Sequence, residues 1–164
     1  MEWLLLSEKC IWFGLAAVGF GILFNIPSRT LVPVFIMGAI GGFAKVALLH
    51  LGINIVGASL FGATLIGCLS IPFAHSKHAP PPMFSIPAVI PMVPGVLAYR
   101  MMLGLIDLAA DTNPAAYNQI LSETIHNGLK VMFILMSLAI GVALPMLVTR
   151  KESAKEIRFR RPIK

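Results

Sequence analysis

Several stretches of this chain run for the length of a membrane-spanning helix without a charged side chain. Residues 55–74 are uncharged throughout, and residues 131–149 form another uncharged run. A helix needs about 20 apolar residues to cross a bilayer. Over the whole chain 57% of residues are hydrophobic and 12% are charged, whereas soluble domains average about 25% charged residues. The sequence therefore predicts an all-α integral membrane protein and excludes a soluble globular enzyme.

Turn-forming residues divide the chain into five predicted spans. Asn25 to Arg29, around Pro27, interrupts the first helix, and Gly52 to Asn54 forms a tight turn after the second. The expected spans are residues 10–26, 30–51, 55–74, 83–106 and 125–149. Residues 107–124 are predicted to be a polar, acidic loop in which a short surface helix starts at Pro114. This gives a five-helix membrane domain, residues 1–149, and a tail, residues 150–164.

The tail sets the predicted orientation. It holds seven of the 13 Lys and Arg residues, and basic segments beside a span stay in the cytoplasm. Five spans then place the N-terminus outside. We expect the tail to bind anionic lipid headgroups and not nucleic acid. If the fourth span is re-entrant instead, the number of crossings is even and the N-terminus is cytoplasmic.

The fourth predicted span is broken by prolines. Pro87, Pro91 and Pro94 lie on one helical face, and Gly95 follows before a new helix begins near Val96. Each interior proline costs about 3 kcal/mol and removes a hydrogen bond to a carbonyl four residues earlier. Transporters use such breaks to line a substrate path. A simple kink absorbed by neighbouring helices is the alternative. The carbonyls predicted to be freed are those of Met83, Pro87 and Ile90.

Three cations lie within predicted spans: Lys45, Arg100 and Lys130. Ionisable residues at membrane depth are functional candidates by default, although long side chains near helix ends also reach back to water. Lys45 and Arg100 are candidate substrate-lining residues, with Asp107 and Glu123 as possible charge partners. Asn127 is a further candidate for lining a cavity.

Small residues recur at the spacing that lets helices approach closely. Gly38 and Gly42, with Gly41 beside them, share a face with Lys45. In lipid such faces drive helix association, so they predict a tightly packed bundle or a docking face for another subunit. The chain shows no nucleophile–base pair and no metal-ligand spacing. We therefore expect no enzyme activity, no metal site and no cofactor.

Four segments together resemble the threonine/serine exporter family. In order they are FNIPSR, GAIGGFAK, LGINIVGASLFG and IPAVIPMVPGVLAYRMM, spanning Phe24 to Met102. The pattern is most similar to the small, separate subunit of the YjjB type. IPMVPG is the most specific part, and the turn containing Asn25, Pro27 and Arg29 supports it.

This resemblance implies half of a two-component exporter in the bacterial inner membrane. A larger YjjP-type membrane subunit would be the partner, and a small carboxylate metabolite, either threonine/serine or a dicarboxylate such as succinate, would be the substrate. A non-transporting scaffold subunit that stabilises a complex is the alternative, and an intramembrane enzyme is the weakest interpretation.

Overall fold

The computed structural model describes residues 2–110 and 114–149, and side chains within residues 7–110 and 116–149. This part of the chain is helical and contains no strand. The helices, in order, are α1 (Glu2–Leu23), the 3₁₀ turn η1 (Ser28–Thr30), α2 (Leu31–His50), α3 (Ile55–Lys77), α4 (Pro82–Val89), the 3₁₀ turn η2 (Ile90–Met92), α5 (Gly95–Ala109) and α6 (Pro114–Thr149).

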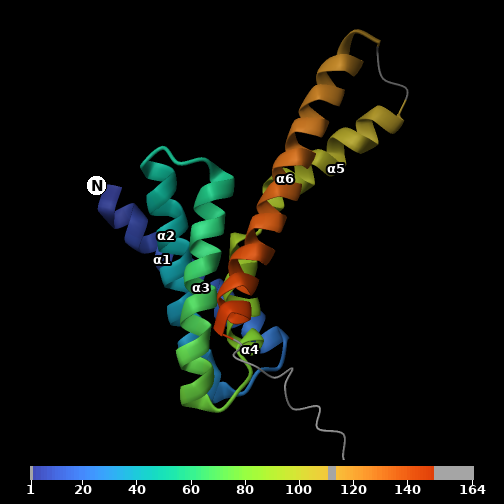
Figure 1. Ribbon diagram of the computed structural model, residues 1–164. Coiled ribbons are helices and arrows are strands. Elements are labelled where there is room, and N and C mark those ends of the chain that lie inside the picture. Colours follow the sequence, from blue (N-terminus) through green and yellow to red (C-terminus); the bar gives the residue numbers. More distant parts are fainter. Residues whose placement is uncertain (1, 111–113, 150–164) are drawn as a thin grey trace, which may run out of the picture.

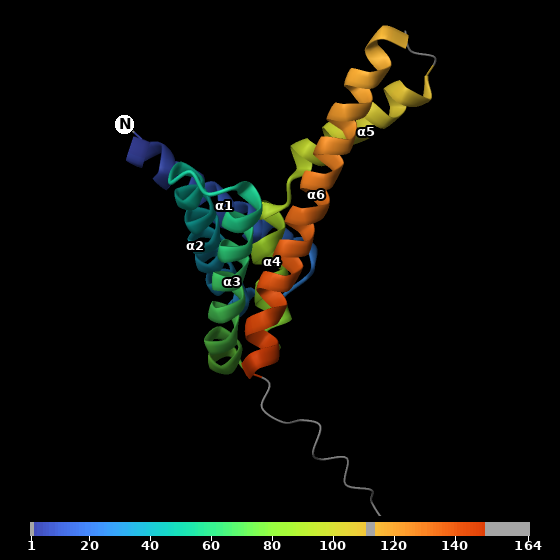
Figure 2. The ribbon, with the colours of Figure 1, turned by 45° about the horizontal axis from the view of Figure 1, so that its top comes forward.

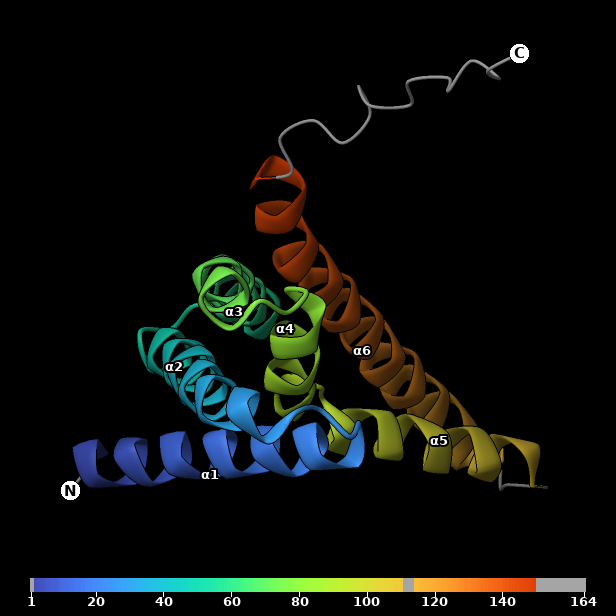
Figure 3. The ribbon, with the colours of Figure 1, turned by 90° about the horizontal axis from the view of Figure 1, so that it is seen from below.

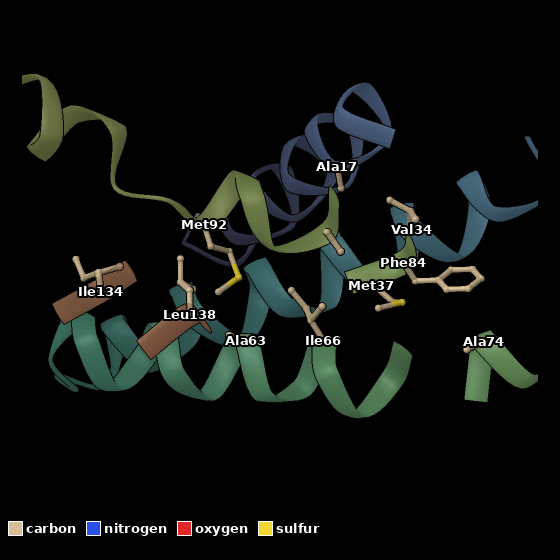
Figure 4. Packing of buried hydrophobic residues seen from close by; sticks show 11 residues of the cluster. Ala17, Val34, Met37, Ala63, Ile66, Ala74, Phe84, Met92, Ile134 and Leu138 are labelled. Atoms are coloured by element: carbon tan, nitrogen blue, oxygen red, sulfur yellow. The ribbon is translucent and has the colours of Figure 1, made fainter. Parts of the chain in front are cut away.

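Four helices and half of a fifth form a bundle. α1 packs on α2, α2 on α3, and α3 on the C-terminal part of α6, while α4 contacts α1, α2 and α3 (Figures 1 and 3). Their buried hydrophobic side chains meet in one cluster (Figure 4). The largest fully buried members are Phe84, Met37, Ile66, Met92 and Ile134. No residue of α5 is buried, so the fully buried core residues of the broken segment lie in α4 and η2.

The turns form where the sequence predicts them. Asn25 adopts a left-handed backbone with φ 54°, and Gly52 does so with φ 81°. The side chain of Asn54 caps α3 by accepting a hydrogen bond from the N–H of Gly57 at 2.7 Å. Such a cap satisfies one of the N–H groups that a helix start leaves without a partner. α3 therefore begins at Ile55, the residue at which the third span was predicted to start.

Small residues bring the helices of the bundle together. A Cβ added at Gly38 would lie 2.6 Å from the Cβ of Ala17, and one at Gly41 would lie 2.6 Å from Cγ1 of Ile66. A Cβ at Gly42 would overlap the ring of Phe13. The face carrying Gly38 and Gly42 is thus filled by α1 of the same chain. It does not offer the docking face for another subunit that the spacing also allowed.

α5 and residues 114–130 of α6 leave the bundle as a two-helix arm (Figures 1 and 2). Close contacts hold the pair together, because a Cβ at Gly104 would overlap Thr124 and one at Gly128 would lie 3.0 Å from the sulfur of Met101. We call this pair the arm. At about 1.5 Å per residue, α6 with its 36 residues is about 54 Å long. It is therefore longer than the hydrocarbon core of a bilayer, about 30 Å.

The region between the fourth and fifth predicted spans differs from expectation. α5 continues through Asp107 to Ala109, and α6 is one helix from Pro114 to Thr149. The predicted helix start at Pro114 is confirmed, whereas the expected loop and the separation of that helix from the last span are wrong within the described residues. Pro114 is tolerated because the first turn of a helix needs no N–H donor. No proline or glycine lies between Ala115 and Asn127 to interrupt the helix.

Within the described residues, three helices are long and apolar enough to cross a membrane: Ser28–His50, Ile55–Lys77 and Ala116–Thr149. The pair Pro82–Met92 and Gly95–Ala109, bent by 59°, makes a fourth if it is a single broken span. α1 is not in this set. The five-span count and the orientation remain predictions, and the basic tail lies outside the described residues.

The first prediction concerns orientation. A reporter fused after Lys164 should be active on the cytoplasmic side, and one inserted at Asn113 should be active on the opposite side. The physical reason is the positive charge gathered in the tail. Paired alkaline phosphatase and green fluorescent protein fusions would measure it. Both fusions reporting the same side would exclude an odd number of crossings between them.

A second prediction concerns helix packing. Gly38→Ala should lower the thermal stability of the purified protein, because the added methyl group meets Ala17 and the carbonyl of Phe13, neither of which can move away easily. Overpacking of this kind typically costs about 1–3 kcal/mol.

Gly19→Ala is the matched control, since nothing lies within 4 Å of a Cβ at Gly19. Its melting temperature in detergent should be equal to or above that of the wild type, because alanine favours helix more than glycine does. Equal losses in the two variants would show that α1 and α2 do not meet at Gly38.

Candidate functional site

The break in the fourth predicted span lies between η2 and α5. Val93 has an extended backbone with φ −61° and ψ 134°, as expected for a residue before proline. In a continuous helix the carbonyl of Met92 would accept the N–H of Val96. The extended residue carries Val96 away, so the Met92 carbonyl loses that partner. Gly95 instead donates to the carbonyl of Val93 at 2.9 Å.

Lys45 occupies the vacated position. Its Nζ donates a hydrogen bond to the carbonyl oxygen of Met92 at 2.7 Å. The residue is 8% exposed and comes from α2, so this bond ties α2 to the point where the broken helix ends.

The carbonyls predicted to be free were those of Met83, Pro87 and Ile90. For Ile90 this is wrong, because its carbonyl accepts the N–H of Val93 at 3.0 Å.

Gly62 of α3 makes room for this meeting point. A Cβ at Gly62 would lie 2.5 Å from Cε of Met92, 2.9 Å from the carbonyl of Gly41 and 3.5 Å from Cβ of Lys45. Any side chain larger than glycine would therefore push α2, α3 and η2 apart. Three segments that are distant in sequence, α2, α3 and η2, therefore pack together beside Lys45 and Met92.

The electrostatics of Lys45 are unusual for a buried charge. An ammonium carries three N–H donors, and in the described residues its one hydrogen bond goes to a neutral carbonyl. Buried charges are normally paired, because desolvation costs several kcal/mol. Ser59 lies one helical turn before Gly62, and its buried hydroxyl has no hydrogen-bond partner in the described part of the chain. The centre of the bundle thus holds polar groups with unused hydrogen-bonding capacity.

The structure divides the predicted site residues between two places. Lys45 and Pro87 are buried in the bundle, and Pro91 and Pro94 flank Met92 at the break. Gly95 has open space around it, and Val96 is exposed.

Arg100 and Asn127 line a different cavity of about 470 Å³ in the arm, together with Asp107 and Glu123. Lys130 is exposed and is not among that cavity's lining residues.

Two features of the site were not found from sequence. One is the Met92 carbonyl, and the other is the unpartnered Ser59. The signal that was missed for Met92 is Pro94. A proline restricts the residue before it, here Val93, to an extended backbone. The Met92 carbonyl, one residue earlier, then loses its helical hydrogen-bond partner. Ser59 gives no sequence signal, because serine is common in packed membrane helices.

The helices, the break and the buried cation define a class: a multi-span membrane protein with an interrupted helix inside its bundle. Residues 9–148 match the family model described as threonine/serine exporter, ThrE. The chain therefore belongs to the threonine/serine exporter family, a family of transporters and not of enzymes.

One curated relative is an uncharacterized protein of Haemophilus influenzae, 34% identical over 139 residues. The alignment covers 84% of this chain and 46% of that protein. The chain thus spans about half the length of this relative. No solved structure matches this chain.

A third prediction concerns the break. Pro94→Ala should straighten the segment, because Val93 is then free to become helical and Val96 can bond the Met92 carbonyl. Pro91→Ala should have less effect, since Pro91 lies within η2, before the extended residue. Spin labels at positions 86 and 105, in a chain whose Cys10 and Cys68 are replaced by alanine, would report the distance by pulsed electron resonance.

The distance between the labels should lengthen in Pro94→Ala and change less in Pro91→Ala. The same shift in both variants, or in neither, would show that Pro94 does not set the bend.

Proposed function

We propose that this chain is one subunit of a two-component exporter of small carboxylate metabolites in the bacterial inner membrane. The observation that carries the proposal is the buried Lys45 ammonium bonded to the Met92 carbonyl at the helix break. A carboxylate is a stronger acceptor for an ammonium than a neutral carbonyl is. A substrate carboxylate would therefore replace Met92 as the acceptor of Lys45.

The start of α5 adds a second attraction for an anion. Helix N-termini present N–H groups without intrahelical acceptors and carry a partial positive charge. The N-terminus of α5 at Gly95 lies three residues beyond Met92. In the proposed mechanism the carboxylate binds between Lys45 and this N-terminus while the Met92 carbonyl is released. Threonine, serine and a dicarboxylate such as succinate all carry the required carboxylate.

The proposed partner is a larger membrane subunit of the YjjP type. The match to about half of the Haemophilus influenzae protein supports this part of the proposal, since that relative has a further segment of similar length. Apolar side chains on the arm, such as Val96, Tyr99 and Ile125, are exposed and form a surface suited to lipid or to another membrane helix.

A fourth prediction tests the role of Lys45. Lys45→Met keeps the aliphatic bulk and removes the charge. Export by cells that express the chain with its partner should fall about tenfold to a hundredfold, as expected for the loss of one hydrogen bond to a charged ligand, about 1.5–3 kcal/mol. Lys45→Arg should be milder because it retains a cation. Extracellular threonine, serine and succinate would be measured.

Lys130→Met is the matched control, because it removes an exposed lysine from α6. Its export should equal the wild type, and all variants should reach the membrane in equal amounts. Wild-type export by Lys45→Met with partner binding intact would favour the alternative, a scaffold subunit whose lysine serves the fold alone.

A further inference from the structure

A groove of about 500 Å³ lies at the end of the bundle where α3 and α6 terminate. The two helices touch before they reach it, because a Cβ at Gly67 would lie 2.9 Å from the carbonyl of Val142 and 3.1 Å from Cγ of Pro145. Beyond that contact, Pro81 and Pro82 at the start of α4 form one wall of the groove. The other lining residues are Ile71 and His75 of α3 and Ala143, Met146, Leu147 and Thr149 of α6.

The wall of the groove changes from apolar to polar toward the helix ends. Ile71 lies deeper in the bundle, whereas His75 lies one turn nearer the end of α3 and Thr149 is the last residue of α6. The ring of His75 is held in place, because its Nδ1 donates to the carbonyl of Ile71 at 2.8 Å. A second hollow, of about 530 Å³, adjoins the groove at His75 and also contains His78. An apolar groove with a polar outer end has the polarity of a lipid chain and its headgroup.

This end of the bundle is cationic. Arg29 precedes α2 and Lys77 ends α3, and both lie here because α2 and α3 run antiparallel around a tight turn (Figures 1 and 2). The sequence contains no Asp or Glu in residues 9–106. The acidic side chains that the structure describes are Glu8 in the first half of α1 and Asp107 and Glu123 in the arm.

The tail adds cations directly beside the groove. Thr149 lines the groove, and Arg150 and Lys151 follow it in the sequence. Because successive Cα atoms are about 3.8 Å apart, the covalent chain alone keeps these two cations near the outer end. Residues 150–164 hold seven Lys and Arg against two Glu. Each cation beside a membrane-spanning helix strengthens the attraction to anionic lipid headgroups about fivefold.

We propose that this groove is a binding site for one anionic phospholipid. An acyl chain lies along the apolar wall between α3 and α6, and the phosphate lies at the outer end, near His75 and the cations that follow Thr149. The charge selects an anionic headgroup over a zwitterionic one. Since Pro81 and Pro82 form one wall, the lipid also supports the start of α4, the helix that leads to the break. The site is separate from Lys45 and does not depend on the proposed substrate.

The test measures lipid retention by native mass spectrometry of the full-length chain. The protein is released from mixed micelles that contain equal amounts of dioleoylphosphatidylglycerol and dioleoylphosphatidylcholine, which have the same chains and differ in headgroup charge. The wild type should retain one phosphatidylglycerol and prefer it to phosphatidylcholine by at least about tenfold, because two cations near the phosphate each contribute about fivefold.

Ala143→Phe should fill the groove without changing the charge. Retention of phosphatidylglycerol should fall at least about tenfold, the loss expected when about two methylene groups of the lipid are no longer buried. Ala139→Phe is the matched control, because Ala139 is exposed one turn earlier on the same helix and does not line the groove. It should retain lipid as the wild type does. Equal melting temperatures of the two variants without lipid would show that both are folded.

Arg150→Gln with Lys151→Gln removes the two cations next to Thr149. The preference for phosphatidylglycerol should fall about tenfold or more, while retention of phosphatidylcholine stays the same. Arg160→Gln with Arg161→Gln removes the same charge ten residues further along the tail and should preserve the preference. Both double variants leave the lining residues unchanged, so they test the site even if Ala143→Phe fails to fold.

Three results would overturn the inference. Equal retention of the two lipids by the wild type would show that headgroup charge is not recognised. An equal loss of preference in the two tail variants would show diffuse attraction by the tail and no localised site. If folded Ala143→Phe keeps its phosphatidylglycerol, the groove is not where the lipid binds, and loss of the partner subunit by that variant would assign the groove to a protein helix.

Discussion

The hydrogen bond between the Lys45 ammonium and the Met92 carbonyl is the interaction on which the organisation of the bundle depends. Both groups are costly to bury alone, because an uncompensated ammonium or carbonyl loses its hydration without replacement. Pro94 makes Val93 extended, so Val96 no longer bonds Met92 and the Met92 carbonyl lacks its helical donor. Lys45 of α2 supplies the missing hydrogen bond to the Met92 carbonyl. The break persists in an apolar bundle because a second element of the chain satisfies it.

This bond requires an unusually close approach of three segments. Gly41 and Gly62 allow it, since a Cβ at Gly62 would lie 2.9 Å from the carbonyl of Gly41. Burial of apolar surface gives little drive for helices to associate in lipid, so close packing and polar contacts must hold the bundle together. The glycines of α2 therefore serve two purposes. Gly38 and Gly42 allow α1 to pack closely, and Gly41 allows α3 to pack against α2 beside Lys45.

Much of this arrangement was predictable from the sequence. The uncharged runs and the turns at Gly52 and Asn25 located α2 and α3, and the proline spacing located the break. Lys45 and the break were recognised, but the bond between them was not, because helical periodicity gives the faces of single helices and not which helices meet. The arm was missed for another reason. The polar, acidic composition of residues 107–124 predicts a loop, although the three- and four-residue spacing of Glu123, Thr124 and Asn127 is that of a helix face.

α5 connects the helix break to the arm mechanically. No residue of α5 is buried, and its tertiary packing is mainly against α6, while the extended residue Val93 joins it to η2. Arg100 lies five residues after Gly95, less than two helical turns from the break. In the proposed mechanism, a substrate carboxylate that takes Lys45 away from Met92 would remove a restraint at one end of α5. Release at the break would therefore act on α5 and, because α5 packs mainly against α6, on the arm as a whole.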